Sequence, residues 1–241
     1  KQLKFILSIV FILSLFFASF YIKDFRIDAS SDTLVSQNDK DFDYFNYYQK
    51  IFPTKNSLVV AVKSESEIDN NLLEEIKTLS KKISNISEVS SVFNINKAPI
   101  LFLNETSLID LSNNNIDTIL DTNLDTKEVL DEFSQSPLYK DQIINNSKNI
   151  TSIVIFLKNN KKLEDLKEKK EKYLLNNTYY KIKTEIDIDR SNLISKIRSI
   201  LNEGSNKYIY YLGGVEMISS DVISYVKNDI ITFSIIVLII V

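Results

Sequence analysis

Residues 57–95 read SLVVAVKSESEIDNNLLEEIKTLSKKISNISEVSSVFNI, and their pattern gives the clearest prediction of the fold. Its first seven residues are rich in β-branched side chains, which is typical of a buried strand. Isoleucine and leucine then recur at spacings of three and four from Ile68 to Ile86, which predicts an amphipathic helix. Ser64 and Glu67 match a capping box that would begin this helix. Residues 88–95 return to a strand pattern, so the stretch predicts a β-α-β unit.

A second unit of the same kind follows later in the chain. Residues 150–158, ITSIVIFLK, predict a strand, and residues 207–212, KYIYYL, predict another that ends in a turn or hinge at Gly213 and Gly214. Between these strands, apolar residues repeat at helical spacing: Leu193, Ile194, Ile197, Ile200 and Leu201. Two β-α-β units predict an α+β domain of the ferredoxin-like kind, with its helices on one face of the sheet.

The segments between these units give weaker signals. Residues 97–149 are interpreted as an insertion with a short helix at residues 126–133. Residues 161–175 are highly charged and predict a solvated helix. Residues 181–189, KIKTEIDID, alternate polar and apolar side chains, which favours a strand over an entry into the next helix.

An apolar run occupies the beginning of the chain. Residues 5–22 read FILSIVFILSLFFASFYI, and a helix of about 18 residues is roughly 27 Å long, enough to span a bilayer. Lys1 and Lys4 precede it, which predicts that this end stays in the cytoplasm. A cleaved signal peptide is the alternative, but the apolar run is long for one and lacks a small-residue cleavage site. The absence of an initiator Met suggests that the true start lies upstream.

A second apolar run closes the chain. Residues 230–241 read IITFSIIVLIIV, which is too short to span a membrane and predicts a second membrane helix that is cut within its span. A buried core helix is the alternative interpretation. Proline and glycine are absent from residues 215–241, so the helix that begins after Gly214 is expected to continue unbroken into the apolar run.

These patterns divide the chain into four parts. Residues 1–22 form the first membrane helix with a short cytoplasmic start, and residues 23–56 form a connecting segment. Residues 57–214 form an extracytoplasmic domain, and residues 215–241 lead into the second membrane helix. The positive flank of the first helix places residues 23 to about 228 outside the cytoplasm.

The composition excludes several classes of function. A net charge of −3 and a pI near 5.2, without a basic stripe, argue against nucleic-acid binding. The chain has no Cys and no His, which removes the usual thiol nucleophile, the commonest general base and the commonest zinc ligands. Only three glycines occur, so no phosphate-binding glycine loop can be written. We therefore expect neither an enzyme nor a bound cofactor.

A few acidic residues could in principle bind a cation. Glu185, Asp187 and Asp189 would share one face of the predicted strand, although a solvated face explains them more simply. Asp28 and Asp32 follow the first apolar run and fit turn or capping positions. No catalytic residue, metal site or substrate-binding residue is predicted from these carboxylates.

Aromatic residues gather in the connecting segment: Phe42, Tyr44, Phe45, Tyr47 and Tyr48. Their spacing predicts a helix, and packing into a core is the favoured interpretation of their side chains. Contact with an amphiphilic substrate or with the membrane interface is the alternative.

Three stretches together resemble a known family. Residues 25–53, FRIDASSDTLVSQNDKDFDYFNYYQKIFP, combine acidic positions, Asp-x-Leu and an aromatic helix directly after a membrane helix. Residues 57–95 resemble a first porter β-α-β unit. Residues 189–204, DRSNLISKIRSILNEG, with residues 208–233, YIYYLGGVEMISSDVISYVKNDIITF, resemble the closing helix, strand, Gly-Gly turn and entry into the second membrane helix. This ordered combination resembles the resistance-nodulation-cell division superfamily, in particular its hydrophobe/amphiphile exporters related to the large mycobacterial membrane transporters.

The resemblance implies a multi-pass exporter of the bacterial inner membrane, built from two homologous halves. It implies that proton entry drives export of hydrophobic or amphiphilic molecules such as lipids or drugs, with the lipid bilayer as surroundings and a possible homo-oligomeric assembly. The proton-relay acids of the family lie in later membrane helices, so no relay residue is assigned in this chain. The unbroken helix after Gly213 and Gly214 is expected to transmit tilting of the membrane helix to the porter domain.

Two other interpretations share this layout. A membrane-anchored sensor or chemoreceptor also brackets an extracytoplasmic domain with two membrane helices. A protein-translocation subunit of the same superfamily is a nearer alternative. Sequence beyond Val241 separates them, because an exporter continues into several more apolar spans and a sensor continues into a cytoplasmic signalling module.

Overall fold

The computed structural model describes residues 10–11, 13–14, 16–17, 40–52, 55–103, 117–120, 124–168 and 177–240. The chain divides into two compact units: Asn38–Asp221, and a second unit made of Lys1–Gln37 with Val222–Val241. The predicted first membrane helix, residues 5–22, lies largely outside the described residues, as does the whole of residues 18–39.

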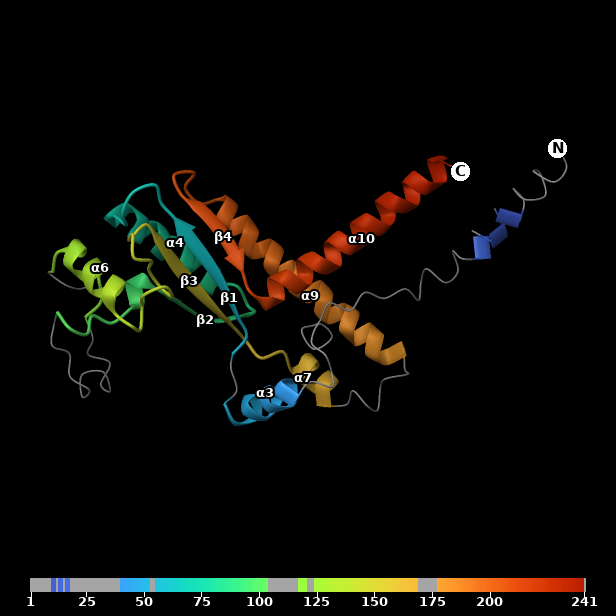
Figure 1. Ribbon diagram of the computed structural model, residues 1–241, viewed down its shortest axis with the longest axis horizontal. Coiled ribbons are helices and arrows are strands. Elements are labelled where there is room, and N and C mark those ends of the chain that lie inside the picture. The colour runs from blue at the N-terminus through green and yellow to red at the C-terminus, as the bar shows by residue number, and fades with distance from the viewer. Residues whose placement is uncertain are drawn as a thin grey trace. The chain divides into compact units, whose positions relative to one another are not determined.

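A four-stranded antiparallel sheet forms the centre of the Asn38–Asp221 unit (Figure 1). Its strands are β1 (Ser57–Lys63), β2 (Val89–Asn94), β3 (Ile150–Leu157) and β4 (Ile209–Gly213). The spatial order is β2-β3-β1-β4, so the first and third strands are central and the second and last are edges. Helix α4 (Asn70–Ser84) connects β1 to β2, and helix α9 (Asn177–Asn202) lies between β3 and β4. The α+β prediction is therefore confirmed.

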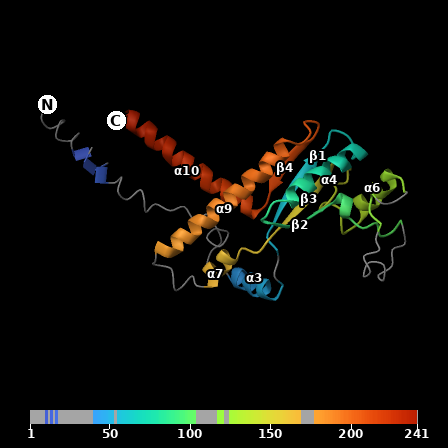
Figure 2. The same ribbon diagram turned by 180° about the vertical axis from the view of Figure 1, so that it is seen from behind.

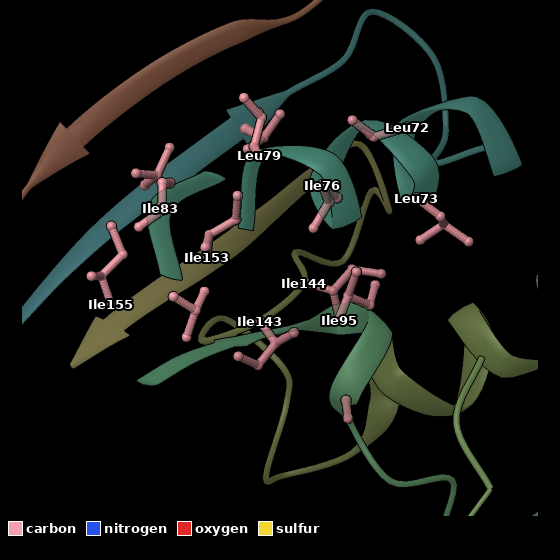
Figure 3. Close-up of a cluster of buried hydrophobic side chains, with 14 of the residues drawn as sticks. Leu72, Leu73, Ile76, Leu79, Ile83, Ile95, Ile143, Ile144, Ile153 and Ile155 are labelled. Carbon is pink, nitrogen blue, oxygen red and sulfur yellow. The ribbon is translucent and has the colours of Figure 1, made fainter. Parts of the chain in front are cut away.

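Helices α4 and α9 lie on the same face of the sheet, as the two opposite views show (Figures 1 and 2). Alternate residues of β1, Leu58, Val60 and Val62, are completely buried, whereas Val59 between them is 36% exposed. Register aligns Val60 with Ile153 on β3 and with Leu212 on β4, so the buried side chains of neighbouring strands share one face. The main core lies between this face and the helices (Figure 3).

Helix α4 has the apolar face that its sequence predicts. Its buried residues at spacings of three and four are Leu72, Leu73, Ile76, Leu79 and Ile83, all labelled in Figure 3. The predicted capping box is wrong, because the helix begins at Asn70 and Asp69 caps it through a 2.8 Å hydrogen bond from the Leu72 amide. The amides of Ser64 and Ile68 instead donate to the carbonyls of Asn149 and Lys148, which attaches this stretch to the residues just before β3.

The predicted strand at residues 181–189 is also wrong, because these residues form the first half of α9. Ile186 is buried and Ile188 is 54% exposed, so the alternation does not correspond to one buried face. Ile186 instead continues the helical series of Leu193, Ile197 and Leu201 at spacings of seven and four. The helical periodicity extends over a longer window than the alternation, and it determines the structure.

The middle of the chain contributes to the core. The turn η2 (Ile95–Lys97) and helix α6 (Thr126–Gln135) follow β2, which confirms the short helix predicted at residues 126–133. Val129, Leu130 and Phe133 are fully buried, so α6 packs as part of the domain rather than as a peripheral insertion. The helix predicted at residues 161–175 is present as the short helix α7 (Lys161–Glu168), and residues 169–175 lie outside the described part of the chain.

Two further helices flank the sheet in the sequence. Helix α3 (Lys40–Ile51) precedes β1, and helix α10 (Val215–Ile240) follows β4 as one continuous helix. Among the residues that the structure describes, no helix combines the length and hydropathy of a membrane span.

Candidate coupling site at the start of helix α10

The chain passes from β4 into α10 through Gly213 and Gly214. Gly214 has a φ of +129°, and a Cβ atom there would lie 3.0 Å from the Leu58 side chain and 3.0 Å from the Ser57 carbonyl oxygen. Glycine adopts this backbone conformation without steric cost and leaves room for β1. The Gly214 carbonyl accepts a 3.0 Å hydrogen bond from the Ile218 amide, so the first turn of α10 starts at Gly214. Because Gly214 lies close to Ser57 and Leu58, the helix begins directly against β1.

The Glu216 carboxylate in the first turn of α10 accepts hydrogen bonds from two other parts of the domain. Arg190 of α9 donates from Nε to Glu216 Oε2, and Asn56 before β1 donates to Oε1 over 3.2 Å. Arg190 also donates to Asp187 Oδ1 over 3.1 Å. The side chains of Arg190, Asp187 and Glu216 are only 14%, 19% and 16% exposed. A negative charge at a helix N-terminus is also favoured by the helix dipole.

Arg198 and Asp221 form a second link between α9 and α10. Arg198 donates from Nη1 and Nη2 to the two Asp221 carboxylate oxygens over 2.9 and 2.8 Å. This fork-to-fork geometry fixes the orientation of both side chains. Arg198 is 45% exposed and Asp221 is 22% exposed, so this pair contributes less to stability than the Arg190 pair.

The start of α10 also packs against the domain. Ser219 and Ser220 are buried, and Met217, the single methionine of the chain, packs against the hydrophobic core. The glycine turn, the two arginine links and this packing together define the α10 base, residues 214–221. A helix held in this way over two turns resists bending at its attachment point.

The far end of α9 is fixed by a separate group of hydrogen bonds. The Glu75 carboxylate of α4 accepts a 2.9 Å bond from the Ser205 amide and a 3.0 Å bond from the Tyr210 hydroxyl of β4. Burial raises the pKa of Tyr210, and the hydrogen bond to Glu75 raises it further, so Tyr210 stays a neutral donor. Gly204 accommodates this hydroxyl, because a Cβ there would lie 2.8 Å from Tyr210 Oη. The chain is thus held at the middle of α9 by Arg190 and just beyond its C-terminal end by Glu75.

The residues singled out in the sequence have different outcomes. Gly213 and Gly214 form the turn at the α10 base, while their use as a hinge stays a prediction. Glu185, Asp187 and Asp189 lie on a helix instead of one strand face: Glu185 pairs with Lys162 at 3.3 Å and Asp187 pairs with Arg190. Within the described ranges no group of acidic side chains is arranged to hold a metal ion. Asp28 and Asp32 lie outside the described residues.

The aromatic residues before the sheet form the predicted helix, α3, but their predicted packing into a core is wrong. Tyr44, Phe45, Tyr47 and Tyr48 are 64%, 56%, 59% and 43% exposed. The side chain of Phe42 is not among those described. Helical spacing shows which residues share a face and carries no information about what covers that face.

Sequence reasoning missed the two arginine links, although a signal was present. The chain contains 29 Lys and Arg residues together, and only three of these, Arg26, Arg190 and Arg198, are arginine. Arginine binds a carboxylate with two parallel hydrogen bonds, which lysine cannot do. Arg198 uses that geometry with Asp221, whereas Arg190 divides its hydrogen bonds between Glu216 and Asp187. In so lysine-rich a chain, two arginines on one helix indicate positions where a side chain with several donors is used.

Comparison of the chain with family models, with curated proteins and with solved structures finds no match.

Proposed function

We propose that this chain is the N-terminal part of a proton-driven inner-membrane exporter of hydrophobic or amphiphilic molecules, of the resistance-nodulation-cell division type. The observation that carries this proposal is the passage from sheet to helix. A β-α-β-β-α-β domain with strand order β2-β3-β1-β4, the ferredoxin-like arrangement, continues through a glycine turn into one unbroken helix. Porter domains of the proposed type enter the second membrane helix in this way.

The distal part of α10 supports a membrane location. Its described apolar side chains from Ile230 to Ile240 are each at least 40% exposed, and Ile239 and Ile240 reach 79% and 78%. A continuous apolar surface of this kind requires a lipid or protein environment. In the proposal, residues 5–22 and the helix from Ile230 onward span the bilayer, and residues 23 to about 228 form an extracytoplasmic porter-type domain.

The α10 base is proposed as the mechanical connection between membrane and porter domain. Proton passage through the later helices of such an exporter would tilt the second membrane helix. Arg190 and Arg198 join α10 to α9, and the close contact of Gly214 holds α10 against β1. Tilting of α10 would therefore move α9 and the sheet together with it, instead of bending the chain at Gly214. Such a movement would open and close a substrate path beside the domain.

The test uses the complete gene expressed in a bacterium and loaded with a fluorescent amphiphilic cationic dye. Wild-type protein should lower dye accumulation, and a protonophore should abolish this effect. Insertion of Gly-Ser-Gly-Ser after Ser224 should abolish export at normal expression. Insertion of four alanines at the same site should preserve it, because four residues add about one helical turn and keep the helix continuous.

The outcomes separate the steps of the proposal. Export that survives the glycine-serine insertion contradicts the coupling role of α10. Dye accumulation that is insensitive to both expression and protonophore contradicts proton-driven export of amphiphilic cations. An open reading frame beyond Val241 that encodes a cytoplasmic signalling module, instead of further apolar spans, would establish the sensor alternative.

A further inference from the structure

Helix α3 carries an exposed apolar surface that the α10 base does not involve. We name it the aromatic face; its members are Tyr44, Phe45, Tyr47, Tyr48 and Ile51, with Phe52 directly after the helix. Their exposed fractions range from 43% to 67%, and every described side chain of α3 is exposed. At helical spacing these residues lie within one side of the helix.

The rings of the aromatic face are arranged in a row along the helix. The ring centroids of Tyr44 and Tyr48 lie 4.8 Å apart, and their hydroxyls lie 3.2 Å apart. The next ring in the row, Phe52, stacks on Tyr48 at 6.5 Å with an interplanar angle of 14°. The rings therefore form an ordered surface in which the hydroxyls of Tyr44 and Tyr48 lie together.

An uncovered surface of this kind is energetically unfavourable in water. Burial of one large apolar side chain contributes about 1.5–3 kcal/mol, and the aromatic face has six such side chains. Three of the six are tyrosines, whose rings are apolar and whose hydroxyls require a polar partner. An apolar ring and a polar hydroxyl on one side chain are best satisfied together at a boundary, where an apolar environment meets a polar one within a few ångströms.

The position of α3 in the sequence points to the surface of the bilayer. Residues 23–39 separate α3 from the apolar run 5–22, and a chain of this length spans at most about 60 Å. Helix α3 is thus tethered within reach of the membrane that the first apolar run would enter. Tyrosine is enriched at the headgroup level of membranes for the reason given above.

We propose that α3 lies along the outer surface of the bilayer, with the aromatic face in the headgroup region. This proposal rests on the membrane location proposed above. It assigns to the connecting segment a second, peripheral contact with lipid in addition to the spanning helices. Such a contact would hold the start of β1 at a fixed height above the membrane.

The chain contains no tryptophan, so a single substitution creates a unique fluorescent reporter. The 241-residue chain would be reconstituted into vesicles of phosphatidylethanolamine and phosphatidylglycerol, with and without lipids brominated near the headgroup end of the acyl chain. Tyr47→Trp reports on the aromatic face. Tyr211→Trp, on a residue of β4 that is 55% exposed, is the matched control on the sheet. Phe233→Trp reports on the apolar part of α10.

We expect emission from Tyr47→Trp to shift to shorter wavelength and to be quenched by the brominated lipids, while Tyr211→Trp stays water-exposed and unquenched. Quenching of Phe233→Trp without quenching of Tyr47→Trp overturns the α3 proposal and leaves the membrane location intact. Absence of quenching in both contradicts the membrane location itself. Emission from Tyr47→Trp that is shifted to shorter wavelength but not quenched would indicate burial against a protein partner or a second copy. Equal quenching of Tyr211→Trp and Tyr47→Trp would indicate that the lipid contact is not specific to α3. Either result overturns the proposal.

Discussion

Gly214 is subject to two separate constraints. Its φ of +129° disfavours any L side chain, and its Cα lies so close to β1 that a Cβ would contact both a side chain and the backbone of Ser57 and Leu58. The backbone atoms cannot move aside as a flexible side chain could. Gly213, one residue earlier, has neither constraint, because a Cβ there would lie 3.9 Å from the nearest atom, the Val59 carbonyl oxygen.

We therefore expect Gly214→Ala to destabilise the Asn38–Asp221 unit by about 1–3 kcal/mol, since it combines backbone strain with a steric clash. Gly213→Ala should change the free energy of unfolding by much less. Urea unfolding of the two variants in the same detergent or lipid gives the comparison. Equal destabilisation by both substitutions would show that the turn needs two glycines for another reason.

The cap of α4 gives a pH-dependent prediction. The amide of Leu72 lowers the pKa of Asp69 below its ordinary value of 3.8, with smaller contributions from Asn71 and Lys207. Because the folded-state pKa is the lower one, the ionised cap stabilises the fold above the ordinary pKa, and this stabilisation is lost as pH falls through the folded-state pKa.

Asp69→Ala should cost about 1 kcal/mol at neutral pH through loss of the cap. Asp69→Asn should cost less, because an amide oxygen still accepts from the Leu72 amide, and it should remove this contribution to acid destabilisation. Unfolding free energies measured at neutral and acidic pH test both statements. An Asn variant with unchanged acid sensitivity would assign that sensitivity to other carboxylates.

At the scale of elements, the two arginine links between α9 and α10 differ in burial. Arg190 and Glu216 are mostly buried, so removal of one partner leaves a poorly solvated charge. Arg198 and Asp221 are more exposed, and water screens their interaction. The two links thus contribute unequally to stability, although both orient α10.

A double-mutant cycle with Arg190→Gln and Glu216→Gln should give a coupling energy of about 1–3 kcal/mol. The cycle with Arg198→Gln and Asp221→Asn should give about 1 kcal/mol or less. Added salt should weaken the second more than the first. A larger coupling energy for the Arg198 pair would contradict the ranking by burial.

The sequence predicts the elements of the domain better than their limits and surroundings. Strand β1 follows from a short run of β-branched residues, helix α4 follows from a long regular helical period, and β4 ends where its glycines predict. Residues 181–189 favour a strand in the sequence because this nine-residue window alternates polar and apolar side chains. Only the continuation to Leu193 and Leu201 shows the helical period.

Of the candidate site, only the backbone turn at Gly213 and Gly214 could be predicted from the sequence. Two adjacent glycines indicate a turn, but the contact of Gly214 with Leu58 depends on the pairing of β1 with β4, which lie far apart in the sequence. The same holds for Arg190 and Glu216, which meet only after α9 and β4 are in place. Long-range contacts of this kind are not encoded in any local pattern.

At the scale of the whole molecule, the orientation of the chain is directly testable, because it contains no cysteine. Thr78 is exposed on α4, so Thr78→Cys introduces a single accessible thiol in the proposed extracytoplasmic domain. Gln2→Cys places one in the predicted cytoplasmic start. A membrane-impermeant maleimide applied to spheroplasts should label Thr78→Cys directly and Gln2→Cys only after permeabilisation. The reverse pattern would invert the proposed topology.

The strand order also has a consequence for biosynthesis. The central strand β1 pairs on one side with β3, where Leu58 lies opposite Ile155, and on the other with β4, where Val60 lies opposite Leu212. Both neighbours leave the ribosome after β1 itself, β3 from Ile150 onward and β4 from Ile209 onward, so the two edges of β1 have no partner until these strands are made. Pairing over such distances is slow, and unpaired apolar edges are prone to aggregate. We therefore expect the nascent chain to be prone to aggregation until Gly213 has emerged.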